Sequence, residues 1–274
     1  MEPILKWAGG KRQLLPEIKK VIVTLNFNGH CFYEPFVGGG AVFMDMCFPK
    51  AAINDINPEL INVYIQIKEN PYELIKLLEK HKENHCHDYF YEIRNLDRNP
   101  DFEKMSDIEK AARTIYLNRV CYNGLYRVNS KGQFNVPLGR YSNPEIVLKD
   151  KILELSDYLK SNNIKITCQD FEKSIKSAKQ GDLIYFDPPY DYEESGFTSY
   201  TKDGFSKDSL IRLKKVCDKL LEKGCKIILS NNDTKFVNEL FSEEKYKIKH
   251  VLAKRMINCN GEKRDSVMEV IIYG

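Results

Sequence analysis

The sequence predicts an α/β protein in which helices cover both faces of a mostly parallel sheet. Strand and helix patterns alternate over residues 1–57, and the alternation returns after Pro144. The chain has 274 residues, 42% hydrophobic and 30% charged, so it is long enough to bury a core and too apolar for a disordered chain. No apolar stretch reaches the roughly 18 residues that a membrane span needs.

The elements follow from local periodicity and from turn residues. We expect helices over 11–23, 41–47, 146–160 and 206–223. We expect strands over 31–37, 51–55, 165–168, 182–187, 225–230, 246–251 and 267–273.

The middle of the chain has a different character. Residues 58–119 are expected to be mainly helical, and Ser106 and Glu109 form a capping-box pattern that begins one of these helices. Residues 118–141 are rich in Asn, Gly, Arg and Tyr, and the stretch VNSKGQFNV predicts a hairpin with loops. The helical block therefore looks like an insertion in the α/β pattern, with a separate function.

Charge and cysteine content bear on nucleic-acid binding and on the cellular compartment. The 42 Lys and Arg against 39 Asp and Glu leave a formal net charge of +3, so any nucleic-acid surface must be local. Residues 119–141 carry four basic side chains and no acidic one. The eight cysteines form no CxxC pair and the start has no apolar region of a signal peptide, which predicts reduced thiols and a cytoplasmic protein.

The segment DPPY, residues 187–190, follows the apolar stretch 183–186 and has to turn at the end of that strand. Ligands of open α/β sheets bind at such strand ends. Asp187 and the Pro188 carbonyl can accept the two N–H bonds of a planar amine, while Tyr190 can stack on its ring. An ordinary proline turn is the alternative.

The segment EPFVGGG, residues 34–40, predicts a strand, a glycine turn and a helix, an arrangement that lets a nucleotide-like ligand approach the backbone. Asp55 ends the next strand, where a carboxylate suits the hydroxyls of a ribose. Alternatively, Asp55 or Asn57 caps a helix before Pro58.

Two further segments are ambiguous by themselves. KWAGGK contains the single Trp of the chain, Trp7, and Lys11, which can bind a carboxylate. Asp170 and Phe171 follow another strand and could contact an adenine by hydrogen bonding and packing. The alternatives are core packing for Trp7 and an ordinary loop for the Gly-Gly-Lys segment. For Asp170 and Phe171 they are helix capping and core packing.

The family resemblance is carried by the ordered segments LKWAGGKRQLLP, FYEPFVGGGAVF, INDINPELIN, CQDFEK and LIYFDPPY. Together they resemble the DNA adenine methyltransferase (Dam) family, the alpha group of N6-adenine-specific DNA methyltransferases, over almost the whole chain. Residues 122–141 resemble its recognition hairpin. The resemblance implies a site-specific enzyme that transfers methyl from S-adenosylmethionine to adenine N6 in duplex DNA, at GATC, by base flipping.

The resemblance also implies a division of the chain. Residues 1–57 and 145–274 would form a Rossmann-like catalytic domain that binds S-adenosylmethionine. Residues 58–144 would form an inserted, mainly helical target-recognition domain that carries a β-hairpin. The catalytic residues would be Asp187, Pro188 and Tyr190, with no metal.

Site residues are expected in two groups. The resemblance assigns the cofactor to Trp7, Ala8, Gly9, Lys11, Glu34, Phe36, Gly38, Asp55, Asp170, Phe171 and Asp187. It assigns DNA to Arg119, Tyr122, Asn123, Leu125, Arg127, Asn129, Lys131, Pro137, Arg140 and Tyr200. Arg127 is expected to bind a guanine edge, and residues 194–205 to close over the flipped base.

Several alternatives stay open at this stage. The same fold could methylate cytosine N4, an RNA adenine or a protein glutamine; by resemblance, Asp187 favours adenine over cytosine or glutamine. A DNA-binding module without catalysis is the second alternative. The cluster of His81, His85, Cys86 and His87 predicts a solvated helix face rather than a zinc site. We expect a monomer or weak dimer of bacterial or phage origin, with a cognate restriction endonuclease as an optional partner.

Overall fold

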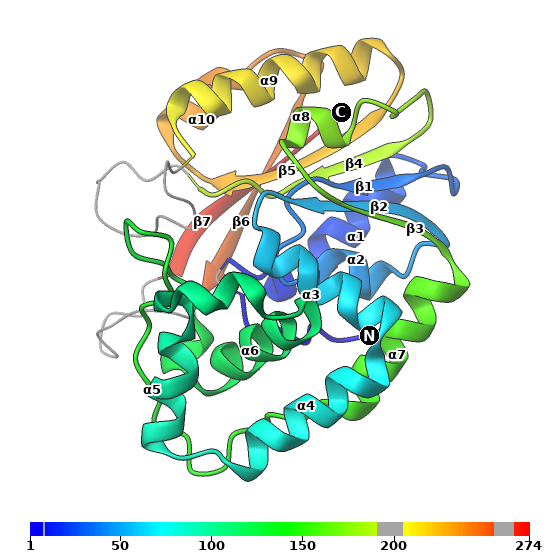
Figure 1. The fold of residues 1–274 in the computed structure, drawn as a ribbon. Helices are drawn as coiled ribbons and strands as arrows, with labels where there is room; N and C mark the ends of the chain where they lie inside the picture. The colour runs from blue at the N-terminus through cyan, green and yellow to red at the C-terminus, as the bar shows by residue number, and fades with distance from the viewer. Residues whose placement is uncertain (8, 191–204, 255–265) are drawn as a thin grey trace.

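The computed structural model describes residues 1–7, 9–190, 205–254 and 266–274. Within these ranges seven strands form one sheet in the order β3-β2-β1-β4-β5-β7-β6 (Figure 1). The strands are β1 (Phe32–Glu34), β2 (Lys50–Asp55), β3 (Asn163–Cys168), β4 (Leu183–Phe186), β5 (Lys226–Asn232), β6 (Lys247–Lys254) and β7 (Ser266–Tyr273). Neighbours among β1 to β5 pair in parallel, whereas β7 is antiparallel to both β5 and β6.

The helices cover the two faces of this sheet, as predicted (Figure 1). Helices α8 (Phe171–Ser174), α9 (Lys207–Glu222) and α10 (Lys235–Leu240) contribute to one apolar core. Helices α1 (Leu15–Thr24), α2 (Ala41–Met46), α3 (Pro58–Glu69) and α7 (Lys149–Ser161) contribute to the core on the other face.

Strand β4 shows how the two cores arise from the sequence. Leu183 and Tyr185 pack into the core with α1, α2, α3 and α7, while Ile184 and Phe186 pack into the core with α8, α9 and α10. Side chains alternate across a strand, so a strand buried on both faces is apolar at every position. This is why the run LIYF marks a central strand.

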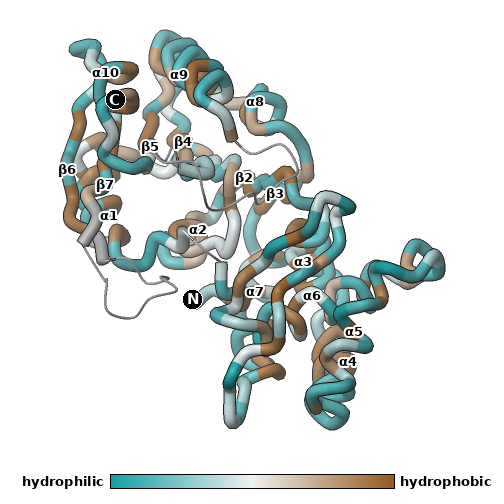
Figure 2. Tube along the Cα trace, turned by 90° about the vertical axis from the view of Figure 1, so that its left-hand side faces the viewer, coloured by the Kyte–Doolittle hydropathy of each residue, from teal (hydrophilic) through white to brown (hydrophobic). Residues whose placement is uncertain are grey.

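Residues 58–144 contain α4 (Pro71–Glu83), α5 (His87–Asn95) and α6 (Asp107–Val120), together with the 3-10 turns η2 (Leu96–Arg98), η3 (Pro100–Lys104) and η4 (Tyr122–Gly124). Helices α4, α5 and α6 lie on the side of the molecule away from α9 and α10 (Figures 1 and 2). The apolar side chains of α3 and α4 join the core of the sheet, whereas Phe90, Tyr116 and Phe134 belong to a separate cluster.

Some boundaries differ from the expected ones for local reasons. The first helix begins as the 3-10 turn η1 (Lys11–Gln13), and its α-helical part has Pro16 in its first turn. The chain before α7 is not helical; Ile146 and Leu148 are buried in different apolar clusters there. The expected hairpin is reduced to single bridges between Cys121 and Leu138 and between Val128 and Phe134.

The expected capping box is confirmed. Ser106 and Glu109 form the reciprocal capping box that begins α6. The cysteines in the described ranges are free thiols. No helix in the same part of the chain is long and apolar enough to cross a membrane.

Candidate active site

The candidate site lies where strand order reverses. Strand β1 pairs with β2 on one side and with β4 on the other, so their carboxyl ends form a topological switch point. The glycine turn follows β1, Asp55 ends β2, and Asp187 follows β4. The sheet therefore brings together three motifs that lie far apart in the sequence.

Asp55 organises the glycine turn. Its Oδ2 accepts a hydrogen bond from the Gly38 backbone N–H at 3.1 Å, and its Oδ1 accepts one from the Asn57 N–H at 3.0 Å. Burial raises the pKa of this carboxyl, and the backbone N–H groups partly offset that effect. Gly38 has a φ of +48°, which disfavours a side chain there. Asn57 caps α3 through the Leu60 N–H, so the capping alternative applies to Asn57.

Asn54 is a positioning residue that the sequence did not single out. Its side-chain amide donates to the carbonyls of Pro35 and Gln169, at 3.0 and 2.9 Å. Its Oδ1 accepts from Thr167 Oγ1 at 2.8 Å and from the Gln169 N–H at 3.1 Å. This buried side chain therefore ties the ends of β1, β2 and β3 together.

Trp7 packs directly on the glycine turn. A Cβ added at Gly38 would lie 2.9 Å from Trp7 Cδ1, and one added at Gly39 would lie 3.0 Å from Trp7 Cβ. The indole also stacks on the ring of Tyr126, with centroids 5.2 Å apart. Tyr64 completes the turn by donating its hydroxyl to the Gly38 carbonyl at 2.9 Å. The glycines of this turn thus make room for protein side chains.

Lys11 lies at the centre of the site. Its Nζ is 2.9 Å from Asp187 Oδ1 and 4.4 Å from the centroid of the Tyr190 ring, and it also contacts the Gly9 carbonyl. The Lys11 side chain is only 5% exposed, so its ammonium is held in a poorly solvated position. The Tyr190 hydroxyl donates to Glu269 Oε2 at 2.6 Å, which anchors the DPPY segment to β7.

Two carboxyl groups, those of Glu34 and Asp187, interact electrostatically with Lys11. Glu34 is buried, and its Oε2 has no hydrogen-bond partner among the described residues. Burial and the nearby Asp187 raise the pKa of Glu34 well above its usual value. Burial also raises the pKa of Asp187 to about 6, although Lys11 opposes this shift. A cation bound beside these carboxyls would stabilise their ionised forms and lower their pKa values.

This donor set fits S-adenosylmethionine, which carries a sulfonium and an α-ammonium group. The partnerless oxygen of Glu34 can accept from an ammonium, and the excess of carboxyls suits a positive ligand. Asp55 has the chemistry to accept from ribose hydroxyls, although it also holds the turn. The residues present therefore fit the cofactor that the sequence resemblance implies.

The other predicted cofactor residues lie in an aromatic cluster. Phe36 packs against Phe171 and Phe205, with centroids 5.3 and 5.7 Å away. Asp170 accepts from the Glu172 N–H at the start of α8 and pairs with Arg212 Nη2 at 2.7 Å. The Arg212 guanidinium also lies over the Phe171 ring, and only 4% of Phe171 is exposed. Adenine binding by Asp170 and Phe171 stays a prediction. Ala8 lies outside the described residues.

The predicted DNA residues fall into two groups. Tyr122, Asn123, Arg127, Lys131, Pro137 and Arg140 are exposed, whereas Leu125 and Asn129 are half-buried. Arg119 is bound by Glu145, to its carbonyl at 2.8 Å and to its Oε2 at 3.0 Å, so a phosphate would compete with that carboxylate. Tyr200 and most of 194–205 lie outside the described residues.

Sequence reasoning missed several site residues besides Asn54 and Tyr64. Tyr126, Arg212 and Glu269 contact predicted site residues from distant parts of the chain. Ile56 follows Asp55 and is 54% exposed. Only Asn54 had a local signal, its place beside Asp55 at the end of a strand.

The histidine cluster is solvated only in part: Cys86 and His87 are exposed, whereas His81 and His85 are half-buried. His81 Nδ1 hydrogen-bonds the Tyr89 hydroxyl at 2.8 Å, and His85 Nδ1 hydrogen-bonds the Tyr116 hydroxyl at 2.9 Å. Burial lowers the pKa of His81 to about 4, so the ring is neutral at pH 7. In the part of the chain that the structure describes, no three His, Cys, Asp or Glu residues are grouped as metal ligands.

Comparison with known proteins identifies the family of the chain. Residues 7–257 match the family described as D12 class N6 adenine-specific DNA methyltransferase. The chain is 46% identical to the type II methyltransferase M1.LlaDCHI of Lactococcus lactis subsp. cremoris, over 100% of this chain and 96% of that protein. It is 41% identical to the type II methyltransferase M.MjaIII of Methanocaldococcus jannaschii, over 99% and 98% of the two chains.

A third relative is the DNA adenine methylase of Escherichia coli K12. It is 32% identical over 97% of this chain and 93% of its own length. The family match and the long, near-complete relatives exclude a chance similarity of isolated motifs. The chain belongs to the D12 class of N6 adenine-specific DNA methyltransferases.

Proposed function

We propose that this N6-adenine DNA methyltransferase acts on the adenine of duplex GATC and reaches it by flipping the base out of the helix. The observation that carries the methyl-transfer part of the proposal is the position of Asp187. It follows β4 at the switch point, beside Lys11 and within the DPPY segment that Glu269 anchors. A planar amine placed there would meet a carboxylate, a proline carbonyl and an aromatic ring.

Methylation requires the DPPY segment to activate adenine N6, which is a weak nucleophile. The lone pair of adenine N6 is delocalised into the ring, so the amine needs acceptors that favour a tetrahedral nitrogen. Lys11 pairs with Oδ1 of Asp187, and we therefore assign one N–H to Oδ2 and the other to the Pro188 carbonyl. The Asp187 carboxylate then stabilises the positive charge that develops on N6. Bound S-adenosylmethionine would supply an activated methyl group, with the S–CH3 bond breaking as the N6–CH3 bond forms, so that the products are S-adenosylhomocysteine, N6-methyladenine and one released proton.

Base flipping follows from the depth of the site. Asp187 is 18% exposed, and an adenine inside a duplex cannot bring N6 to a group in that position. Extruding the base costs about a few kcal/mol. Stacking on Tyr190 returns about 1–3 kcal/mol. Lys11 lies over one face of the Tyr190 ring, so we assign the base to the other face.

Cofactor binding is assigned to the carboxyls of the switch point. Glu34 would accept from the α-ammonium group, and Asp55 from the ribose hydroxyls. Trp7 supports the pocket by packing on Gly38. Lys11 holds Asp187 in its ionised form. The proposed reaction needs no metal ion.

Specificity is assigned to residues 118–141, which we propose to belong to a target-recognition domain over 58–144. Arg127 has five donors in a fixed fork and can bond guanine O6 and N7 together. Lys131 and Arg140 are exposed and suit phosphate contacts. The protein would act in the cytoplasm as a monomer or weak dimer, with or without a restriction endonuclease that cuts the same site.

The test is the rate of methyl transfer to GATC duplexes and to every single-base variant of the site. We expect methylation of GATC and much slower transfer to the variants. Equal rates on GATC and scrambled duplexes would refute the specificity. A 2-aminopurine at the target position should brighten on binding if the base flips, and unchanged fluorescence would refute the flipping step.

A further inference from the structure

The recognition hairpin is too small to hold its own shape. Its two strands share one bridge, between Val128 and Phe134. Two more backbone bonds flank the bridge, from the Asn129 N–H to Gln133 at 2.9 Å and from the Asn135 N–H to Arg127 at 3.0 Å. An isolated hairpin of this length is at best marginally stable in water. Something outside the hairpin must fix residues 134–136.

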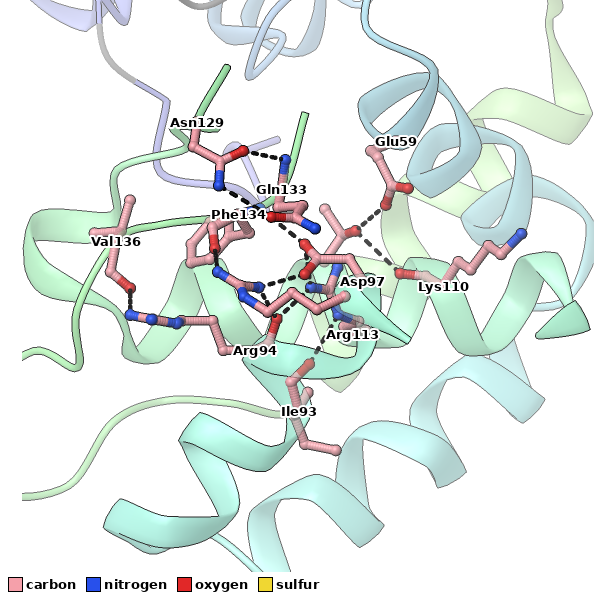
Figure 3. A network of polar contacts seen from close by, with 12 residues as sticks. Glu59, Ile93, Arg94, Asp97, Lys110, Arg113, Asn129, Gln133, Phe134 and Val136 are labelled. Atoms are coloured by element: carbon pink, nitrogen blue, oxygen red, sulfur yellow. Dashed lines mark hydrogen bonds and ion pairs between the residues drawn. The ribbon is translucent and has the colours of Figure 1, made fainter. Parts of the chain in front are cut away.

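Three side chains bind the outer edge of residues 134–136 (Figure 3). Asp97 Oδ2 accepts from the Phe134 N–H at 2.8 Å, and Arg98 Nη2 donates to the Phe134 carbonyl at 2.7 Å. Arg94 Nη1 donates to the Val136 carbonyl at 3.4 Å. These side chains satisfy the backbone groups that a third strand would otherwise satisfy.

Asp97 is the hub of this network (Figure 3). Its side chain is 9% exposed, and its Oδ2 also lies 2.8 Å from Arg113 Nη2, while Arg98 contacts Oδ1. Arg113 is 5% exposed and is held by the carbonyls of Ile93 and Arg94, both at 2.9 Å. Charge-assisted bonds of this kind are stronger and more directional than neutral ones. The carboxylate therefore links α5 and α6 to the hairpin backbone.

The anchored strand in turn orients Arg127. Asn135 follows Phe134, and its Oδ1 accepts a hydrogen bond from Arg127 Nε at 2.8 Å. The Arg127 side chain is exposed, and this bond limits the plane of its guanidinium. A shift of Phe134 would move Asn135, and with it the fork that is assigned to guanine.

We propose that Asp97 is a positioning residue for DNA specificity, because it holds Phe134 so that Asn135 orients Arg127. The inference rests on the proposed function, in which Arg127 binds a guanine edge. Within the described ranges, the side-chain contacts of Asp97 are with Arg98, Arg113 and the Phe134 backbone, and none is with a candidate cofactor residue. Its effect should therefore appear in the preference among DNA sequences and not in cofactor affinity.

The experiment compares Asp97→Asn, Arg127→Ala and the double variant on GATC and on all single-base variants. We expect each single variant to lose about tenfold of the preference at the same base pair. The double variant should lose no more than Arg127→Ala alone, because the two residues act through one contact. The affinity for S-adenosylmethionine should stay unchanged.

Matched variants separate positioning from general loss of stability. Asp101→Asn removes the same charge from an exposed carboxylate that binds only Lys104 among the described residues, and it should leave preference unchanged. Should Asp97→Asn not fold, Arg98→Ala carries the test, since it removes the bond to the Phe134 carbonyl from a side chain that is 28% exposed.

Each outcome has a defined meaning. Undiminished preference in a folded Asp97→Asn or Arg98→Ala protein, or losses that add in the double variant, would overturn the inference. A wild-type protein without GATC preference, or an Arg127→Ala protein with normal preference, would refute the proposed function first. The two failures are therefore distinguishable.

Discussion

Replacing Lys11 by Met should shift the acid limb of the pH–rate profile, where the methylation rate falls in acid, to higher pH. The rate needs the Asp187 carboxylate, because only the ionised group accepts the N–H of N6 and stabilises the charge on it. The pKa of Asp187 is about 6, raised by burial and held down by Lys11 at 2.9 Å. Methionine keeps the length of the lysine side chain and removes its charge.

The size of the shift follows from the ion pair. An opposite charge this close lowers the pKa of a carboxyl by about 1–3. Without Lys11 the pKa of Asp187, about 6 in the wild type, should therefore rise to about 7–9. The wild-type rate should fall about tenfold per pH unit below pH 6, and the variant should show this fall at neutral pH.

Protonation of Asp187 should lower the activity in acid, but it should not destabilise the folded protein. The pKa of Asp187 is raised above its ordinary 3.8, so the folded protein binds this proton more tightly than the unfolded chain. Its contribution to stability is fully present below about pH 4 and is lost as the pH rises through 6. Activity changes in the opposite direction over the same range.

The assay is single-turnover methyl transfer to a saturating GATC duplex, at saturating S-adenosylmethionine, across pH 5–9. Saturation removes any weakening of cofactor binding from the measured limb. Lys11→Arg keeps the charge and should keep the limb near pH 6. A Lys11→Met protein whose limb also stays near pH 6 would refute the ion-pair reasoning.

Three further variants test cofactor binding and DNA recognition. Asp55→Ala should weaken S-adenosylmethionine binding by about tenfold or more in calorimetry, since a hydrogen bond to a charged group contributes about 1.5–3 kcal/mol. An unchanged affinity would mean that Asp55 holds the glycine turn and does not bind the ribose. Arg127→Ala should cost about 1–3 kcal/mol on GATC and relax preference at one base pair, and an unaltered rate profile would assign base readout elsewhere. Lys131→Ala should weaken binding to all sequences alike and reduce the slope of log K against log salt by about one, whereas a sequence-dependent loss would argue against a phosphate contact.

The elements of the site could be predicted because each is a local pattern at a strand end. Asp187, Asp55 and the turn at Gly38 each follow a short apolar run, and the carboxyl ends of parallel strands meet at one edge. The sequence thus predicted which motifs come together without giving the strand order. The reversal at β1 then placed these three motifs around one point.

The contacts within the site could not be predicted in this way. The pair of Lys11 with Asp187, the bond from Tyr190 to Glu269 and the stack of Trp7 on Tyr126 all join distant segments. The bond to Glu269 depends on the insertion of β7 between β5 and β6, and the stack on Tyr126 depends on the path of residues 118–141. No local periodicity encodes either feature.

The hairpin illustrates the same limit at smaller scale. The stretch VNSKGQFNV has the turn residues of a hairpin, and the bridge between Val128 and Phe134 agrees with it. The outward-facing backbone groups of Phe134, which a third strand could bind, are bound instead by the side chains of Asp97 and Arg98.

The central claim is that Asp187 carries out the chemistry at the switch point, and Asp187→Ala tests it most directly. Methyl transfer to a GATC duplex would be followed by mass spectrometry of the product nucleosides, with folding checked by circular dichroism and cofactor binding by calorimetry. We expect a folded protein that forms no N6-methyladenine at a concentration and time at which the wild type completes the reaction. Substantial N6-methyladenine from folded Asp187→Ala protein would contradict the account.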